Sequence, residues 1–336
     1  MSHPFAAAAI GPGEGVVHLA LLPPDTPRLR TLSYKYPLKL VSPAAQQNTS
    51  EPRRLVFAIY LLTYGGGLVA GDAIDLRVVV EETLRITFLT QGSTKLFKAP
   101  SPDVVSTQRL TVDLYRGSAL CYLPDPVQPF EGSRFEQHQI FNLHQPGPEA
   151  PHQSPSLCFL DWVSNGRSAN GEDWSLSRYG SKNELYLQFR DQTRKLLLRD
   201  NLFLDSESSD GIASRMDGLA IFATLVLYGP VFGRLAQFFQ NEFRALPRIG
   251  SPKWDSGSES GGEPEEPDPA MARRAQRQRQ ETADRVLWTA ASARDCVVVK
   301  FGAREVEGGR RWLGSMLDEE GSIEREFGER ALLCLR

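Results

Sequence analysis

Residues 73–89 read AIDLRVVVEETLRITFL, and their apolar side chains recur at every second position. Successive side chains of a β-strand point to opposite faces, so this period predicts strands with one buried face. The predicted buried face consists of Ile74, Leu76, Val78 and Val80 in segment 73–80, and of Leu84, Ile86 and Phe88 in segment 84–89. We therefore expect half-buried antiparallel strands over both segments.

Similar strand signals occur on either side of this stretch. Segments 108–115 and 184–190 also alternate between apolar and polar residues. Three further segments are more continuously apolar, as central strands are, namely 55–62, 195–204 and 219–228. These strands follow one another without regular intervening helices, which argues against a doubly wound α/β fold. The prediction is a mainly β protein.

Helical periodicity is confined to two parts of the chain. Residues 231–243 place several apolar side chains near one helical face, directly after Pro230. Proline is tolerated at a helix start, so a helix is expected here. Residues 303–335 have a weaker helical character that Gly308 and Gly309 interrupt.

A different composition marks residues 249–282. They are rich in Ser, Gly, Pro and Glu, then in Arg, and contain almost no apolar residues. Such a segment buries too little surface to offset the entropy of ordering it, so we expect a disordered, charged insertion. A solvated loop is the simpler interpretation, and an interaction tail is the alternative. The insertion would divide one β-rich domain into 1–248 and 283–336.

The composition excludes several classes of protein. The chain has 336 residues, 41% hydrophobic and 24% charged, with a net charge of −3, so no basic field indicates nucleic-acid binding. Four scattered cysteines without a CxxC pair disfavour disulfides and structural zinc and fit a reducing compartment. No apolar run reaches a membrane span, and the alanines at 6–9 follow no basic stretch. A cytoplasmic protein without a membrane partner is expected.

Three glycines in a row stand out in the segment Tyr64–Asp72, between two predicted strands. They permit positive φ and a close approach of the backbone. The segment could form an elbow that aims Asp72 at a ligand, or a tight turn in which Asp72 is a turn residue. It is neither a phosphate-binding loop nor a dinucleotide fingerprint, because an alternating strand follows it.

Two polar segments follow at predicted strand ends. The first contains Thr90, Gln91, Ser93, Thr94 and Lys95, which bring hydroxyl, amide and ammonium groups together. Such loops often cap themselves with their own hydroxyls. The second, 123–135, contains three prolines that stiffen it and Arg134, which can pair with a carboxylate.

Carboxylates gather in the region from 160 to 184. Asp161 lies among apolar residues, so if it is buried it needs a partner, which Arg167 or Lys95 could supply. Glu172 and Glu184 follow before a predicted strand. The five histidines show no HxH or HxxxH spacing, so a tight nickel or zinc site built by this chain alone is not expected. There is also no G-x-S-x-G nucleophile elbow.

Four ordered blocks resemble the UreD (UreH) family of urease accessory proteins. They are Gly66–Asp72, Thr90–Lys98, Leu123–Phe130 with Ser133–Phe135, and Asp161–Trp162 with Gly166–Arg167 and Gly171–Trp174. The resemblance spans roughly residues 30–245 in order. Ala70 departs from the family pattern, and the insertion 249–282 resembles those of eukaryotic, including fungal, members.

The resemblance implies a fold of packed, partly helically wound, antiparallel or mixed sheets with about two helices. It implies a non-enzymatic scaffold that works with UreF, the GTPase UreG and apo-urease, and a dimer within that complex is compatible with it. It also implies an internal, water-filled path for nickel, with the ion bound weakly and transiently and no tightly bound cofactor.

A conducting path needs ligands that hold a divalent cation loosely. Carboxylates, hydroxyls and carbonyls suit this better than a His/Cys cage. The candidate nickel ligands are Asp72, Asp161, Glu172 and Glu184. The candidate supporting residues are Thr90, Gln91, Ser93, Thr94, Lys95, Arg134 and Arg167. The alternatives are a purely structural adaptor, with these residues as buried ion pairs, and a β-rich hydrolase with Asp72 and Asp161 as paired carboxylates.

Overall fold

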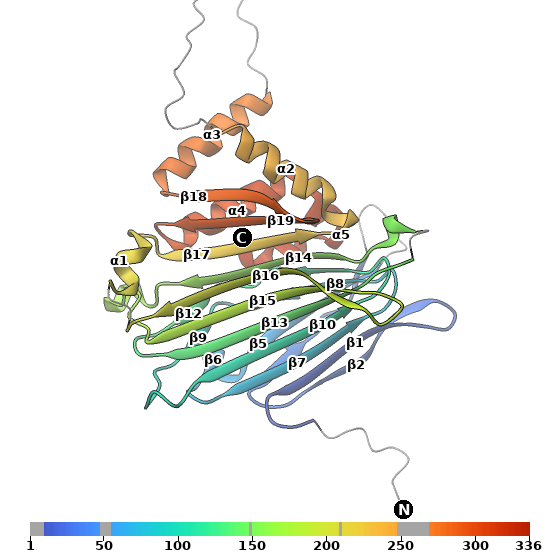
Figure 1. Ribbon diagram of the computed structural model, residues 1–336, viewed down its shortest axis with the longest axis horizontal. Coiled ribbons are helices and arrows are strands. Elements are labelled where there is room, and N and C mark those ends of the chain that lie inside the picture. The colour runs from blue at the N-terminus through green and yellow to red at the C-terminus, as the bar shows by residue number, and fades with distance from the viewer. Residues whose placement is uncertain (1–9, 48–54, 148–149, 208–209, 247–268) are drawn as a thin grey trace, which may run out of the picture.

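The computed structural model describes residues 10–47, 55–147, 150–207, 210–246 and 269–336. Two β-sheets lie face to face, and helices cover part of the second sheet (Figure 1). The predicted mainly β class is confirmed. Within the described residues no helix is both long and apolar enough to cross a membrane.

The first sheet has seven strands. From one edge to the other they are β16 (Arg194–Asp205), β15 (Arg178–Gln188), β13 (Arg134–His144), β10 (Ser106–Leu114), β7 (Ala73–Val80), β1 (Glu14–Leu22) and β2 (Thr26–Tyr34). Each inner strand shows the alternating burial that its sequence predicts, such as Ile74, Leu76, Val78 and Val80 in β7. The two-residue period of the apolar side chains therefore predicted the buried face correctly.

The second sheet has twelve strands. Its main path is β18 (Leu287–Ala293), β19 (Cys296–Ala303), β17 (Ile221–Tyr228), β14 (Ser156–Ser164), β11 (Ala119–Tyr122), β8 (Arg85–Leu89), β5 (Leu55–Thr63) and β3 (Leu38–Val41). Four short strands join it beside this path, namely β4 (Gln46–Gln47), β6 (Gly67–Leu68), β9 (Thr94–Leu96) and β12 (Val127–Pro129).

The prediction of antiparallel pairing is wrong for the central strands. β7 pairs in parallel with both β1 and β10, and β8 pairs in parallel with β5 and β11. The reason is the path of the chain, which runs along the first sheet, returns along the second and then repeats, from β7 to β8, β10, β11, β13, β14 and β15. Because the opposite sheet carries each return, the parallel strands need no crossover helices.

An apolar core fills the space between the sheets, with the inward rows of β7, β10 and β13 facing β8, β11 and β14. β8 departs from the half-buried strand expected for 84–89, because all five of its residues are buried. Its second face lies under α5 (Ser322–Phe327) and the 3₁₀ segment Glu329–Leu335. A central strand of a covered sheet is buried on both faces.

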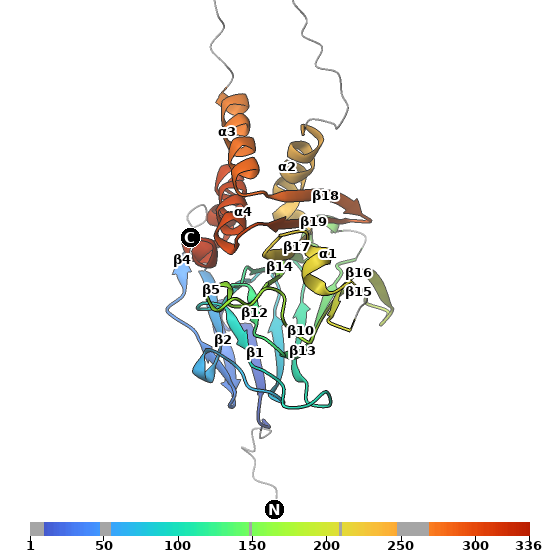
Figure 2. The same ribbon diagram turned by 90° about the vertical axis from the view of Figure 1, so that its left-hand side faces the viewer.

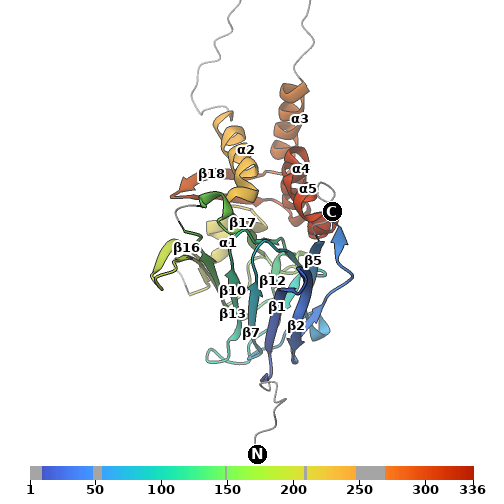
Figure 3. The same ribbon diagram turned by 90° about the vertical axis from the view of Figure 1, so that its right-hand side faces the viewer.

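A helical layer packs on the outer face of the second sheet, with Leu235, Phe239 and Trp312 in its core. The predicted helix at 231–243 is confirmed as α2 (Gly233–Arg244), and α4 (Val306–Glu320) and α5 arise from 303–335. Figures 2 and 3 show α2 and α4 at one end of the molecule, away from the N-terminus.

Gly308 and Gly309 lie in the first turn of α4 rather than interrupt a helix. A Cβ at Gly309 would lie 2.2 Å from the Cδ1 atom of Ile221 on β17. Glycine at this position leaves room for the Ile221 side chain where the helix approaches the sheet. Together with α1 (Ile212–Met216), the described residues contain more helices than the two expected.

The expected disordered insertion, 249–282, is wrong for its second half. Residues 269–282 belong to α3 (Pro269–Ala283), whereas residues 249–268 lie outside the described part of the chain. The sequence of this helix has no apolar stripe from which a helix could be predicted. Ion pairs hold it against α2 instead. Arg274 and Arg277 both bind the buried carboxylate of Glu242 on α2, with the Arg274 Nη2 atom 2.7 Å from Oε1.

This contact predicts how α3 is held. Glu242→Gln removes one partner of a buried ion pair, so we expect the free energy of unfolding to fall by about 3 kcal/mol. The matched control is Glu82→Gln, which alters the exposed pair with Arg116 and is expected to change it by less than about 1 kcal/mol. Urea unfolding measures both variants, and equal stability of the two would contradict the assignment.

Candidate functional site

A band of polar side chains interrupts the apolar core of the first sheet. Its five members face inward, are buried and come from three neighbouring strands: Gln108, Gln137, Gln139, Ser181 and Asn183. The strand register aligns Gln108 with Gln137 and Gln137 with Ser181, and it aligns Gln139 with Asn183. The band is therefore a direct consequence of parallel, in-register pairing.

Asp161 of β14 faces this band from the second sheet. Its Oδ2 accepts hydrogen bonds from the Ser181 Oγ atom (2.5 Å) and the Asn183 Nδ2 atom (2.7 Å), and its Oδ1 accepts one from the Gln137 Nε2 atom (3.1 Å). In the described residues no Lys or Arg side chain pairs with it, so the expected partners Arg167 and Lys95 are wrong. Burial raises the pKa of Asp161, and the three hydrogen bonds oppose the rise.

A small cavity adjoins Asp161. It measures about 20 Å³, room for a single water molecule, and Asp161, Gln137 and Gln139 are among its lining residues. Gln139 donates from Nε2 to the Asn183 Oδ1 atom at 2.9 Å, but its own Oε1 has no hydrogen-bond partner among the described residues, although the residue is only 1% exposed. A buried acceptor of this kind is rare, and it is suited to bind a water molecule or a cation.

Asp125 lies at the outer side of this cavity. Its Oδ2 accepts from the Thr90 Oγ1 atom (2.9 Å) and the Gly92 backbone N–H (2.8 Å), and its Oδ1 lies 2.7 Å from the Arg310 Nη2 atom. The carboxylate thus ties α4 to the loop that follows β8. Asp125 was not among the ligands predicted from the sequence, although its position between two prolines in an apolar segment was a signal.

A pocket of about 250 Å³ opens next to the cavity and shares Leu61, Thr90 and Thr94 with it. The pocket is also lined by the turn Thr63–Gly66 and by residues Gln91–Ser93 of the polar loop that follows β8. Gly65 and Gly66 both have positive φ, 77° and 75°, so the turn depends on glycine there. The structure therefore brings Thr90, Gln91, Ser93 and Thr94 together around one pocket, and their role as supporting residues of a nickel path stays a prediction.

An open groove of about 760 Å³ lies on the outer face of the first sheet. Its lining includes Gln108 and Gln137, which also line the inner cavity. The side chains of both residues face inward, so the paired strands β10 and β13 separate the groove from the cavity.

The other predicted ligands are not gathered around Asp161. Asp72 is half-buried, and its Oδ2 accepts from the Val69 backbone N–H at 2.8 Å, as in a turn. Glu172 pairs with Arg167, whose guanidinium lies over the ring of Phe130. The described residues hold no group of three His, Cys, Asp or Glu side chains placed to bind a metal.

The predicted supporting cations also lie away from the band. Lys95 is exposed on β9, and Arg134 approaches Glu207 at 3.9 Å. Asp72 and Asp161 share no described hydrogen bond or cavity, so the paired carboxylates of the hydrolase alternative are not formed.

Glu184 faces the opposite side of the first sheet from Asn183. Burial would raise its pKa, but hydrogen bonds from His138, Lys182 and Arg199 outweigh this and lower the pKa to about 2. The distances are 2.7 Å from the His138 Nε2 atom and 2.8 Å from the Arg199 Nε atom. Glu184 is therefore an ionised carboxylate whose charge is balanced by cations beside it, and its role is structural.

The lowered pKa sets a pH window. Stability from Glu184 is fully present above its unfolded pKa of 4.5 and is lost as the pH falls through about 2. Glu184→Gln should lower the free energy of unfolding at pH 7, and the difference from the unmodified chain should shrink between about pH 5 and pH 2. The control is Glu136→Gln, in an exposed pair with Arg178. A difference for Glu184→Gln that does not vary with pH would refute this reading.

Comparisons with known proteins agree with this architecture. The model of the family described as UreD urease accessory protein matches residues 13–332. An uncharacterized UreD-like urease accessory protein of Schizosaccharomyces pombe is 30% identical over 293 residues, which is 86% of this chain and 88% of that protein. Urease accessory protein 4 of Cryptococcus neoformans is 33% identical over 65% of this chain and 71% of its own.

A plant relative adds to these fungal ones. Urease accessory protein D of Arabidopsis thaliana is 36% identical over 197 residues, which cover 58% of this chain and 61% of the relative. The family match extends over nearly the whole chain and includes all four sequence blocks. The chain therefore belongs to the UreD family of urease accessory proteins.

Proposed function

We propose that this urease accessory protein delivers nickel to apo-urease through its interior, in a complex with UreF and UreG. The ion would pass between the sheets by way of the polar band and Asp161. The observation that supports this most is the environment of Asp161, a buried carboxylate surrounded by neutral donors and joined to a small cavity.

The ligand chemistry of this environment favours passage over retention. Nickel binds imidazole and thiolate more tightly than isolated carboxylate and amide oxygens. Asp161 and the free Oε1 of Gln139 offer oxygens only, and their neighbours are amides and hydroxyls. A cation here would be neutralised in part and hydrogen-bonded through water, but it would not be trapped.

The connections of the cavity support a route with an entrance. On one side the cavity meets the pocket formed by the glycine turn and the loop Thr90–Thr94. Hydroxyl and amide oxygens thus line this approach to Asp161, as a path for a cation requires.

A purely structural adaptor is the second candidate. The Asp125–Arg310 and Glu242–Arg277 pairs favour it, because they show that buried carboxylates in this chain also dock helices onto the sheet. Asp161 differs from both, since no described cation pairs with it. The three hydrogen bonds that Asp161 accepts join the two sheets, but a neutral acceptor would join them at a lower cost of burial, so a structural role does not require the charge.

Asp161→Asn tests the proposal, because it removes the charge and keeps the shape. In cells that lack the native gene, we expect the nickel content and activity of urease to fall by about tenfold or more, since the charge that draws the cation inward is gone. Co-purification of UreF and UreG should be unchanged.

Glu136→Gln is the matched control, a carboxylate in an exposed pair with Arg178 on the outer face of the same sheet, and should leave urease activation intact. If Asp161→Asn keeps its partners and restores full nickel loading, the path is ruled out and the adaptor is supported. A loss of partner binding in Asp161→Asn would likewise count against the path.

A further inference from the structure

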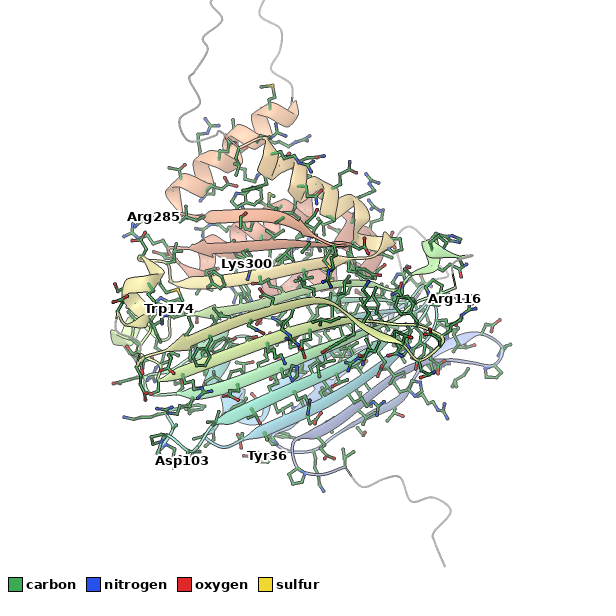
Figure 4. All side chains as sticks on the ribbon, viewed as in Figure 1. Tyr36, Asp103, Arg116, Trp174, Arg285 and Lys300 are labelled. Atoms are coloured by element: carbon green, nitrogen blue, oxygen red, sulfur yellow. The ribbon has the colours of Figure 1, made fainter. Side chains whose placement is uncertain are left out.

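One lysine, Lys300 of β19, reaches toward the polar band from the second sheet. Its Nζ atom lies 2.6 Å from Asp200 Oδ1 on β16 and 3.3 Å from the Thr224 Oγ1 atom on β17. Figure 4 labels Lys300 where β19 and β17 run beside β16. Lys300 thus connects the two sheets at the side of the sandwich.

The strand register links this ion pair to Asp161. Across the second sheet, Asp161 pairs with Thr224 and Thr224 pairs with Lys300. Across the first sheet, Asp200 pairs with Asn183, whose side chain binds Asp161. The two carboxylates and the lysine therefore belong to one continuous polar layer.

We infer that Lys300 is a tethered counter-cation of the interior, which lowers the affinity of the Asp161–Asp200 layer for a divalent cation and so promotes its release. This role rests on the proposed function and names a residue that regulates it. The layer has two carboxylates and one ammonium among its described members, the rest being amides and hydroxyls. Removing the ammonium changes its formal charge from −1 to −2.

The surroundings of Lys300 allow its ammonium group to move between two partners. Its side chain is 34% exposed while that of Asp200 is 15% exposed, so water reaches the pair from one side. The Nζ atom also lies 5.6 Å from the centroid of the Phe222 ring, which offers the ammonium a second favourable contact. A lysine on a flexible stem can move between two such partners.

The ion pair between Lys300 and Asp200 adds little to the stability of the fold. Partly exposed ion pairs contribute little to folding, because water screens them and the side chains lose entropy. Repulsion of a dication by the ammonium is larger, because the product of the charges is doubled and the inner side of the ammonium faces the buried Thr224, where water screens less. The main consequence of Lys300 is therefore on ion affinity.

Lys300→Met tests the inference by removing the charge while keeping the aliphatic stem. In full-length protein titrated with Ni²⁺ by calorimetry, we expect about tenfold tighter binding than in the unmodified chain. Lys300→Arg should bind as the unmodified chain does, and the double variant Lys300→Met/Asp161→Asn should lose the gain. With limiting nickel, Lys300→Met should also load urease more slowly, because the ion is retained.

The matched control is Lys182→Met, which removes a lysine paired with Glu184 on the outer face and should leave Ni²⁺ affinity unchanged. Circular dichroism of each variant verifies folding. If folded Lys300→Met binds Ni²⁺ as the unmodified chain does, the inference is overturned, even where Asp161→Asn still abolishes nickel loading. If Asp161→Asn loads urease fully, the proposed path fails whatever the Lys300 result.

Discussion

The interior depends on one buried negative charge, the carboxylate of Asp161, which sits between two sheets without a described cation beside it. Moving a carboxylate out of water is costly, and hydrogen bonds from Ser181, Asn183 and Gln137 offset part of that cost. Those three residues come into reach because β13 and β15 pair in parallel and in register. The winding of the chain between the sheets therefore creates the polar layer.

The same winding explains why the strands of the sandwich need no crossover helices, so that α2, α4 and α5 serve to cover one sheet face. Each pass along the first sheet is returned by a strand of the second, so the apolar core forms between the sheets without crossover helices. The outer face of the second sheet is then left apolar, and α2, α4 and α5 cover it. Asp125 and Arg310 join this helical layer to the polar loop at the mouth, so the cover and the interior are mechanically connected.

The sequence predicted strands and buried faces well, because alternation in β7 reports which side chains face the core. It could not predict parallel pairing, since alternation says nothing about a strand's neighbour. Helix α3 was missed because its arginines dock on Glu242 rather than through an apolar stripe. Among the proposed ligands, Asp161 differs from Glu172 and Glu184 only in which side chains surround it, and that is a property of the folded sheets. The role of Lys300 was hidden for the same reason, since Asp200 is 100 positions away along the chain.

A divalent cation that occupies the interior beside Asp161 would be visible in anomalous X-ray scattering at the nickel edge, from crystals of the full-length protein soaked with Ni²⁺. We expect a partly occupied peak between the sheets, within coordination or water-bridged distance of Asp161 and the Oε1 atom of Gln139. Nickel found solely on the outer surface, with the cavity beside Asp161 free of metal at saturating concentration, would contradict the proposed path.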